Sequence, residues 1–78
     1  MGAVAYVPFT QVRLGATGWF DDEDAHRTRW VMRKVGPRTI QTWSWENKHP
    51  LEDKSAWEVV LAHPELKYVF VATEDVLP

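Results

Sequence analysis

The sequence predicts an α+β fold, with a four-stranded, mostly antiparallel sheet in the order β-β-β-α-β and one helix packed on its Trp-rich face. Three observations lead to this prediction. Residues 27–48 alternate as a β-hairpin, residues 55–63 show a helical pattern after a capping box, and residues 67–73 form a short apolar run. Because a chain of 78 residues holds one small core, we expect residues 1–78 to form a single domain.

The first predicted strand lies at the start of residues 3–14, where apolar residues occupy both alternating sets of positions. Pro8 has no N–H to donate to a neighbouring strand, which favours an edge strand or a bulge. Residues 15–18 (Gly-Ala-Thr-Gly) are typical of a turn. Trp19 and Phe20, followed by four acids, predict a loop with an aromatic anchor.

The hairpin of residues 27–48 is centred on the turn Gly36-Pro37-Arg38-Thr39, in which Pro37 has the backbone angle that the second turn position needs. Directly opposed residues share a face of the sheet. This register predicts a core face of Trp30, Met32, Trp43 and Trp45. It predicts a second face of Arg27, Arg29, Arg33, Thr42, Ser44 and Glu46, with Arg29 opposite Glu46.

A rival interpretation makes residues 21–36 a helix, with Asp21 as its N-cap and Gly36 just after its end. The acids would then lie at the positive end of the helix and Arg33 and Lys34 at the negative end. We favour the strand, because the apolar residues of this segment do not form a helical stripe.

The predicted helix begins at the capping box Ser55-Ala56-Trp57-Glu58, with Asp53 as a competing N-cap, and ends at Pro64. The run of residues 67–73 (KYVFVAT) is apolar on both sides and is therefore expected to be a central strand.

Composition excludes several classes of protein. The chain has no cysteine, so disulfides, thiolate metal sites and a Cys nucleophile are excluded. Its net charge of −2 is not that of a typical nucleic-acid or membrane binder. The sequence shows no signal-peptide pattern and no apolar run long enough to cross a bilayer, so we expect a cytoplasmic protein without membrane contact.

The sequence predicts no catalytic, cofactor-binding or metal-binding residues, and we expect a protein that is not an enzyme. None of the three histidines has a metal-ligand spacing such as HExxH. Asp22, Asp24 and His26 could present ligands to one divalent ion, but the Gly and the distal Glu of a calcium loop are missing. We therefore expect residues 21–24 to form an exposed, metal-free acidic loop.

The candidate contact surface combines a basic cluster with two aromatic residues. Its predicted members are Arg27, Arg29, Arg33, Lys34, Arg38, Trp19 and Phe20. Arginine predominates among the cations, and its guanidinium fork binds carboxylate or phosphate through two hydrogen bonds. The tryptophans could also form a platform for sugars or bases, but a small domain needs most of their area for its core.

From these features we expect a non-enzymatic binding module whose partner is another macromolecule, most simply a protein. Accessory or inhibitory proteins of phages and mobile elements are often of this size and class. One alternative is a nucleic-acid-binding domain that uses the Arg-rich hairpin face. Another is a structural subunit of a homo-oligomer, held by the edge strand in residues 3–9. The partner, the organism and the oligomeric state do not follow from the sequence.

Overall fold

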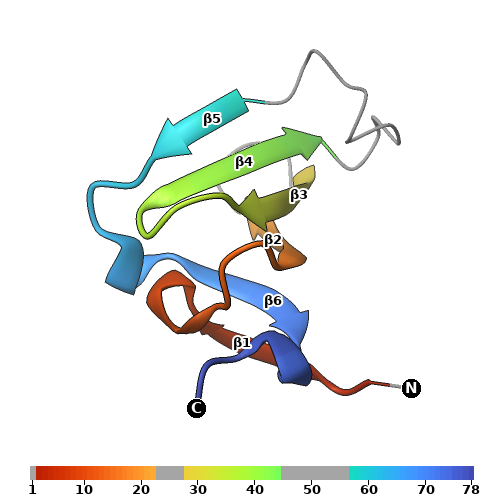
Figure 1. Ribbon diagram of the computed structural model, residues 1–78. Helices are drawn as coiled ribbons and strands as arrows, with labels where there is room; N and C mark the ends of the chain where they lie inside the picture. The colour runs from red at the N-terminus through yellow and green to blue at the C-terminus, as the bar shows by residue number, and fades with distance from the viewer. Residues whose placement is uncertain (1, 23–27, 45–56) are drawn as a thin grey trace.

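The computed structural model describes residues 2–22, 28–44 and 57–78, and these form one six-stranded antiparallel sheet. The strands are β1 (Val4–Pro8), β2 (Thr17–Asp22), β3 (Thr28–Lys34), β4 (Thr39–Ser44), β5 (Trp57–Val60) and β6 (Tyr68–Ala72). Their order in the sheet is β1-β6-β2-β3-β4-β5, so β1 and β5 are the two edges (Figure 1). The described residues also form three single 3₁₀ turns: η1 (Phe9–Gln11) between β1 and β2, η2 (Pro64–Leu66) between β5 and β6, and η3 (Thr73–Asp75) after β6.

The structure is essentially all-β, so the predicted α+β fold was wrong. No α-helix occurs in the described residues, and Trp57–Val60, expected inside a helix, form the edge strand β5. A helix over residues 55–63 would be too short to be stable alone. Valine and tryptophan favour extended backbone, and pairing with β4 supplies the hydrogen bonds that a helix would have made. Ser55 lies outside the described residues.

The core lies against one face of the sheet, which we call the core face. Its fully buried side chains are Phe9, Val12, Met32, Val69 and Val71, joined by Ala16 and Ile40. Strands β3, β4 and β6 contribute from the sheet, while η1 and the segment after it cover them from above. The opposite face is called the outer face below.

The hairpin is confirmed, and so is its turn, but the register is shifted by one residue from the predicted one. The Thr39 N–H donates to the Gly36 carbonyl at 3.4 Å, as the four-residue turn requires. The Thr39 carbonyl then accepts two N–H groups, from Val35 at 3.1 Å and from Gly36 at 3.3 Å. Two residues thus face one, which is a β-bulge, and the extra residue places Lys34 instead of Val35 opposite Ile40.

This shift changes which side chains share a face. Met32 lies opposite Thr42 and Trp30 opposite Ser44, so these four lie on the core face. Trp43 lies opposite Val31 on the outer face, where it is nonetheless buried. The predicted core face of four residues is therefore wrong in composition. Trp45 and Glu46 lie outside the described residues.

Strand β2 was not expected. Trp19 and Phe20, predicted to be in a loop, are in the middle of this strand and pair with Val31 and Trp30 of β3. The chain turns before β2 at Gly15, whose φ of 88° is a conformation that glycine adopts at little cost. The strand interpretation of β3 is confirmed over the rival helix.

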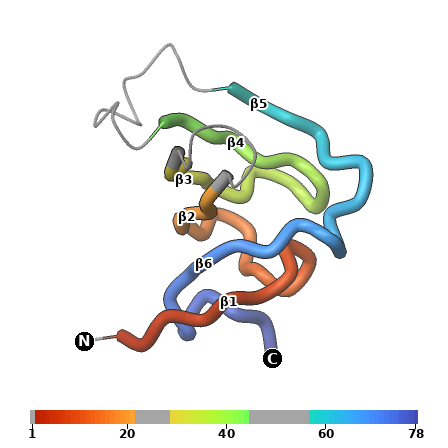
Figure 2. The backbone as a smooth tube through the Cα atoms, turned by 180° about the vertical axis from the view of Figure 1, so that it is seen from behind, coloured from red at the N-terminus to blue at the C-terminus, as the bar shows by residue number. Residues whose placement is uncertain are grey.

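Two other predictions are confirmed by the sheet order. Strand β6 is central, paired with β1 on one side and β2 on the other (Figure 2). Strand β1 is an edge strand that ends at Pro8, as the missing N–H of that residue indicated.

Strands β2 and β6 approach closely at Gly18. A Cβ atom on this residue would overlap the Phe70 carbonyl oxygen and would lie 2.7 Å from Cγ1 of Val71. Backbone cannot move aside as a flexible side chain can, so only glycine allows this strand pair to form without distortion.

We therefore predict that Gly18→Ala destabilises the protein by about 1–3 kcal/mol, the usual cost of overpacking. Gly2→Ala is the matched control, because nothing lies within 4 Å of the added Cβ there. Urea unfolding followed by tryptophan fluorescence measures both. Equal stabilities for the two variants would contradict the close approach.

Candidate functional site

A row of large apolar side chains crosses the outer face of the sheet. Each neighbouring pair in this row is directly opposed across two strands: Tyr6 with Phe70, Phe70 with Trp19, Trp19 with Val31, and Val31 with Trp43. Opposed residues share a face, so the five side chains form one continuous line from β1 to β4. We call this line the aromatic row. With strands about 4.8 Å apart, it is about 19 Å long.

Ring contacts hold the row together at its β1 end. The Tyr6 and Phe70 ring centroids are 4.4 Å apart, and the Trp19 and Phe70 rings are stacked at 5.2 Å with 12° between their planes. Tyr68 extends this group, with its ring centroid 5.4 Å from that of Tyr6. Such contacts fix the rings in place before any partner arrives, which lowers the entropy lost on binding.

Exposure increases along the row from β4 toward β1. Trp43 is buried, whereas Val31, Trp19 and Phe70 are half-buried. Tyr6 is 57% exposed, and the neighbouring Tyr68 is 42% exposed. The β1, β6 and β2 part of the outer face thus presents packed aromatic rings to solvent.

Polar and charged residues border the row on the outer face. On one side Asp21 lies opposite Arg29, and the Arg29 Nε is 2.9 Å from Asp21 Oδ1. This hydrogen bond and the carboxylate charge raise the pKa of Arg29. On the other side Arg33 is half-buried between Thr17 and Gln41, which oppose it from β2 and β4. Glu46, the predicted partner of Arg29, lies outside the described residues.

Lys34, expected on the contact surface, belongs to the core face instead. It is 6% exposed, and its Nζ donates hydrogen bonds to the carbonyl oxygens of Phe9 at 3.0 Å and Val12 at 2.8 Å. The ammonium also lies 4.8 Å from the centroid of the Phe9 ring. Burial lowers the pKa of Lys34. Lys34 therefore stabilises η1 and is not available to a partner.

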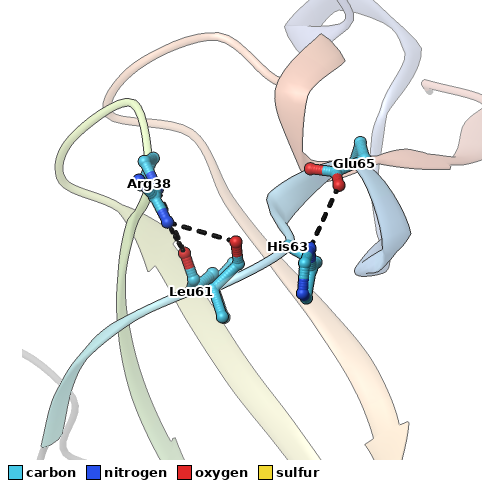
Figure 3. A network of polar contacts seen from close by, with 5 residues as sticks. Arg38, Leu61, His63 and Glu65 are labelled. Carbon is cyan, nitrogen blue, oxygen red and sulfur yellow. Dashed lines mark hydrogen bonds and ion pairs between the residues drawn. The ribbon is translucent and has the colours of Figure 1, made fainter.

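Arg38 also has a structural role. Its Nε and Nη2 donate to the Leu61 carbonyl at 3.2 and 3.0 Å, and Nη2 donates to the Ala62 carbonyl at 3.1 Å (Figure 3). These bonds attach the end of β5 to the hairpin turn. His63 and Glu65, which follow, form an exposed pair at 3.4 Å (Figure 3).

The structure therefore brings only part of the predicted contact residues together. Trp19, Arg29 and Arg33 lie on the outer face. Phe20 instead packs against the core, with Lys67 Nζ 3.5 Å from its ring centroid. Arg27 lies outside the described residues. The outer face also includes Tyr6, Tyr68 and Phe70, which sequence reasoning did not select. The available signal was that the edge strand and the run of residues 67–73 are apolar on both sides.

The described residues show neither a metal-ligand cluster nor a membrane-spanning helix. Among residues 2–22, 28–44 and 57–78, no three His, Asp or Glu side chains are grouped as a metal ion would need. Asp24 and His26 lie outside these ranges. No helix in the described part of the chain is long and apolar enough to cross a membrane. No family model, curated protein or solved structure matches the chain.

The burial of Lys34 predicts how stability changes with pH. Its folded pKa lies below the unfolded value of about 10.4. Between the two values the unfolded chain binds more protons, so the free energy of unfolding increases with pH. We expect the stability of the wild type, relative to a Lys34→Met variant, to rise as the pH is raised from neutral toward about 10.4.

Urea unfolding of both proteins at a series of pH values tests this expectation. All other ionisable groups are the same in both proteins, so the difference isolates Lys34. If the free energy of unfolding of the wild type minus that of Lys34→Met stays constant or falls across this pH range, the expectation is contradicted.

Proposed function

We propose that this protein is a non-enzymatic binding module that contacts a protein partner through the aromatic row. The observation that supports the proposal is the packed, exposed group of Tyr6, Phe70, Trp19 and Tyr68 on the outer face. Tyrosine and tryptophan are enriched among the residues that dominate the energy of protein interfaces. A role as an accessory or inhibitory protein would use such a surface, and it belongs to the same proposal.

The size and border of the row suit a protein interface. A standard interface covers about 800 Å² on each partner, with an apolar centre and a polar rim. A row of about 19 Å matches the centre of such a patch. Arg33 and the Asp21–Arg29 pair lie where the rim would be, so they would affect orientation and association rate more than affinity.

Binding of single-stranded nucleic acid is the second candidate function. The stacked pair of Trp19 and Phe70 on an antiparallel sheet is the kind of platform on which bases stack. The charged residues around the row give less support to nucleic-acid binding. Lys34 is buried, Arg38 binds backbone carbonyls, and Arg29 is paired with a carboxylate, so the predicted basic cluster does not gather beside the row. The net charge of −2 also disfavours phosphate binding.

Alanine substitutions at the exposed Tyr6 of the row and at the neighbouring Tyr68 test the proposal. The partner would first be captured from an extract of the native host by the wild-type protein and identified by mass spectrometry. We expect the double variant Tyr6→Ala/Tyr68→Ala to weaken binding of that purified partner at least about 30-fold, the loss typical of a hot spot. Isothermal titration calorimetry gives the affinities.

The matched control is Leu14→Ala/Leu66→Ala, which removes apolar side chains that are at least as exposed but lie outside the row. Circular dichroism checks that all variants are folded. Wild-type affinity of the tyrosine variant would overturn the proposal. Tight binding of single-stranded oligonucleotides, with an affinity that falls steeply with salt, would replace it with the second candidate.

A further inference from the structure

The outer edge of β5 has the features of a strand that pairs with another chain. This strand is last in the sheet order, and all four of its residues are exposed. Val60 is 70% exposed and Val59 is 43% exposed. An apolar edge strand without proline is a template for further pairing. The opposite edge differs, because β1 contains Pro8, which lacks an N–H.

The hydrogen bonds of β5 show which backbone groups face outward. The N–H of Leu61, just after the strand, donates to the Arg38 carbonyl at 2.8 Å, so residue 61 points its backbone toward β4. Backbone groups alternate along an antiparallel strand, so those of Val59 also point toward β4. The N–H and C=O groups of Glu58 and Val60 therefore point away from the sheet.

A second copy of the chain fits this edge by symmetry. A two-fold axis perpendicular to the sheet pairs the β5 strands of two copies antiparallel. It also leaves the core faces of both copies on the same side of the joined sheet. Only registers that place a residue on the axis keep opposed side chains on one face. With Val59 on the axis, Glu58 lies opposite Val60 of the copy, and these are the residues whose backbone groups face outward. Four inter-chain hydrogen bonds result.

The same register suits the side chains. Val59 opposes Val59 of the copy, and Trp57 opposes Leu61 of the copy. Both pairs lie on the core face. The Trp57 ring also contacts the ring of Trp30, with 5.8 Å between the ring centroids. Moving the axis to Glu58 would place two carboxylates directly opposite each other, which is unfavourable. The sequence of β5 thus favours the Val59 register over the Glu58 register.

We propose that the protein forms a symmetric homodimer in which the β5 strands of two copies pair antiparallel about Val59 and join the two sheets into one. The interface is separate from the aromatic row, so it does not depend on the proposed binding function. It also differs from the oligomer expected through residues 3–9, since it uses the opposite edge of the sheet.

Single cysteines in this cysteine-free chain test the register directly. On the axis, the two Val59 residues face each other without backbone hydrogen bonds between them. The Cα atoms of such a pair lie about 4.5 Å apart, which is within the range of a disulfide. We expect Val59→Cys to form a dimer disulfide at least about tenfold faster than Val60→Cys when both are treated with an added thiol oxidant such as diamide. Val60→Cys is the matched control, because it is at least as exposed but lies opposite Glu58.

Lysine substitutions at the same two positions give a second readout that does not depend on oxidation. Val59→Lys places two like charges opposite each other and should weaken the dimer. Val60→Lys places a lysine opposite Glu58 of the copy and should strengthen it. Sedimentation equilibrium from micromolar to millimolar concentration measures both, with circular dichroism as the check on folding.

Opposite effects of the two lysines, with preferential cross-linking at position 59, support the dimer. A wild-type protein that remains monomeric at millimolar concentration would overturn it, as would equal cross-linking of the two cysteine variants. A dimer that Tyr6→Ala disrupts, and that both lysine variants leave unchanged, would assign the interface to the outer face instead.

Discussion

The two hydrogen bonds accepted by the Thr39 carbonyl determine which side chains of β3 and β4 share a face of the sheet. Because Val35 and Gly36 both donate to this oxygen, β3 gains one residue relative to β4. Without that residue Trp43 would lie on the core face, opposite Met32. With it, Ile40 completes the core, and Trp43 ends the aromatic row on the outer face. Both surfaces discussed above depend on this bulge, since a shift of one residue exchanges the faces of a strand.

The bulge also explains why a lysine is buried. It keeps Lys34 in the ladder, opposite Ile40, with its side chain on the core face below η1. A buried ammonium is costly unless it is hydrogen-bonded, and the carbonyls of Phe9 and Val12 provide acceptors. Burial lowers the pKa of Lys34, because desolvation disfavours the charged form. Lys34 therefore fixes the position of η1 and of the segment after it over the core face.

Features that a single segment specifies could be predicted from the sequence. The run of residues 67–73, the missing N–H of Pro8 and the turn at Pro37 each indicated the correct element. Features that need distant partners could not. Strand β2 contains Gly18 and three polar or acidic residues, and its pairing with β3 and β6 supplies the stability that its composition does not show.

The same distinction between local features and features that need distant partners applies to the candidate site. Trp19 and Arg33 were selected for their residue types, and both lie on the outer face. Tyr6 and Phe70, from the two ends of the chain, meet only because β6 inserts between β1 and β2. The basic cluster was contiguous in sequence, yet the strand alternation sends Arg33 and Lys34 to opposite faces, and the turn directs Arg38 toward β5. Contiguity in a strand is thus poor support for a shared surface.

The two proposed surfaces have a joint consequence for binding. A two-fold axis perpendicular to the sheet would leave the outer faces of both copies on the same side, so both aromatic rows would face one direction. The two β6 strands would be separated by nine strand spacings, at most about 43 Å, and less where the sheet twists. A partner with two sites at that separation would bind a dimer far more tightly than a monomer, because the second contact would be intramolecular. A partner with one site would show no such gain. Comparing the wild type with Val59→Lys on each kind of partner would therefore separate affinity due to the row from affinity due to pairing of β5.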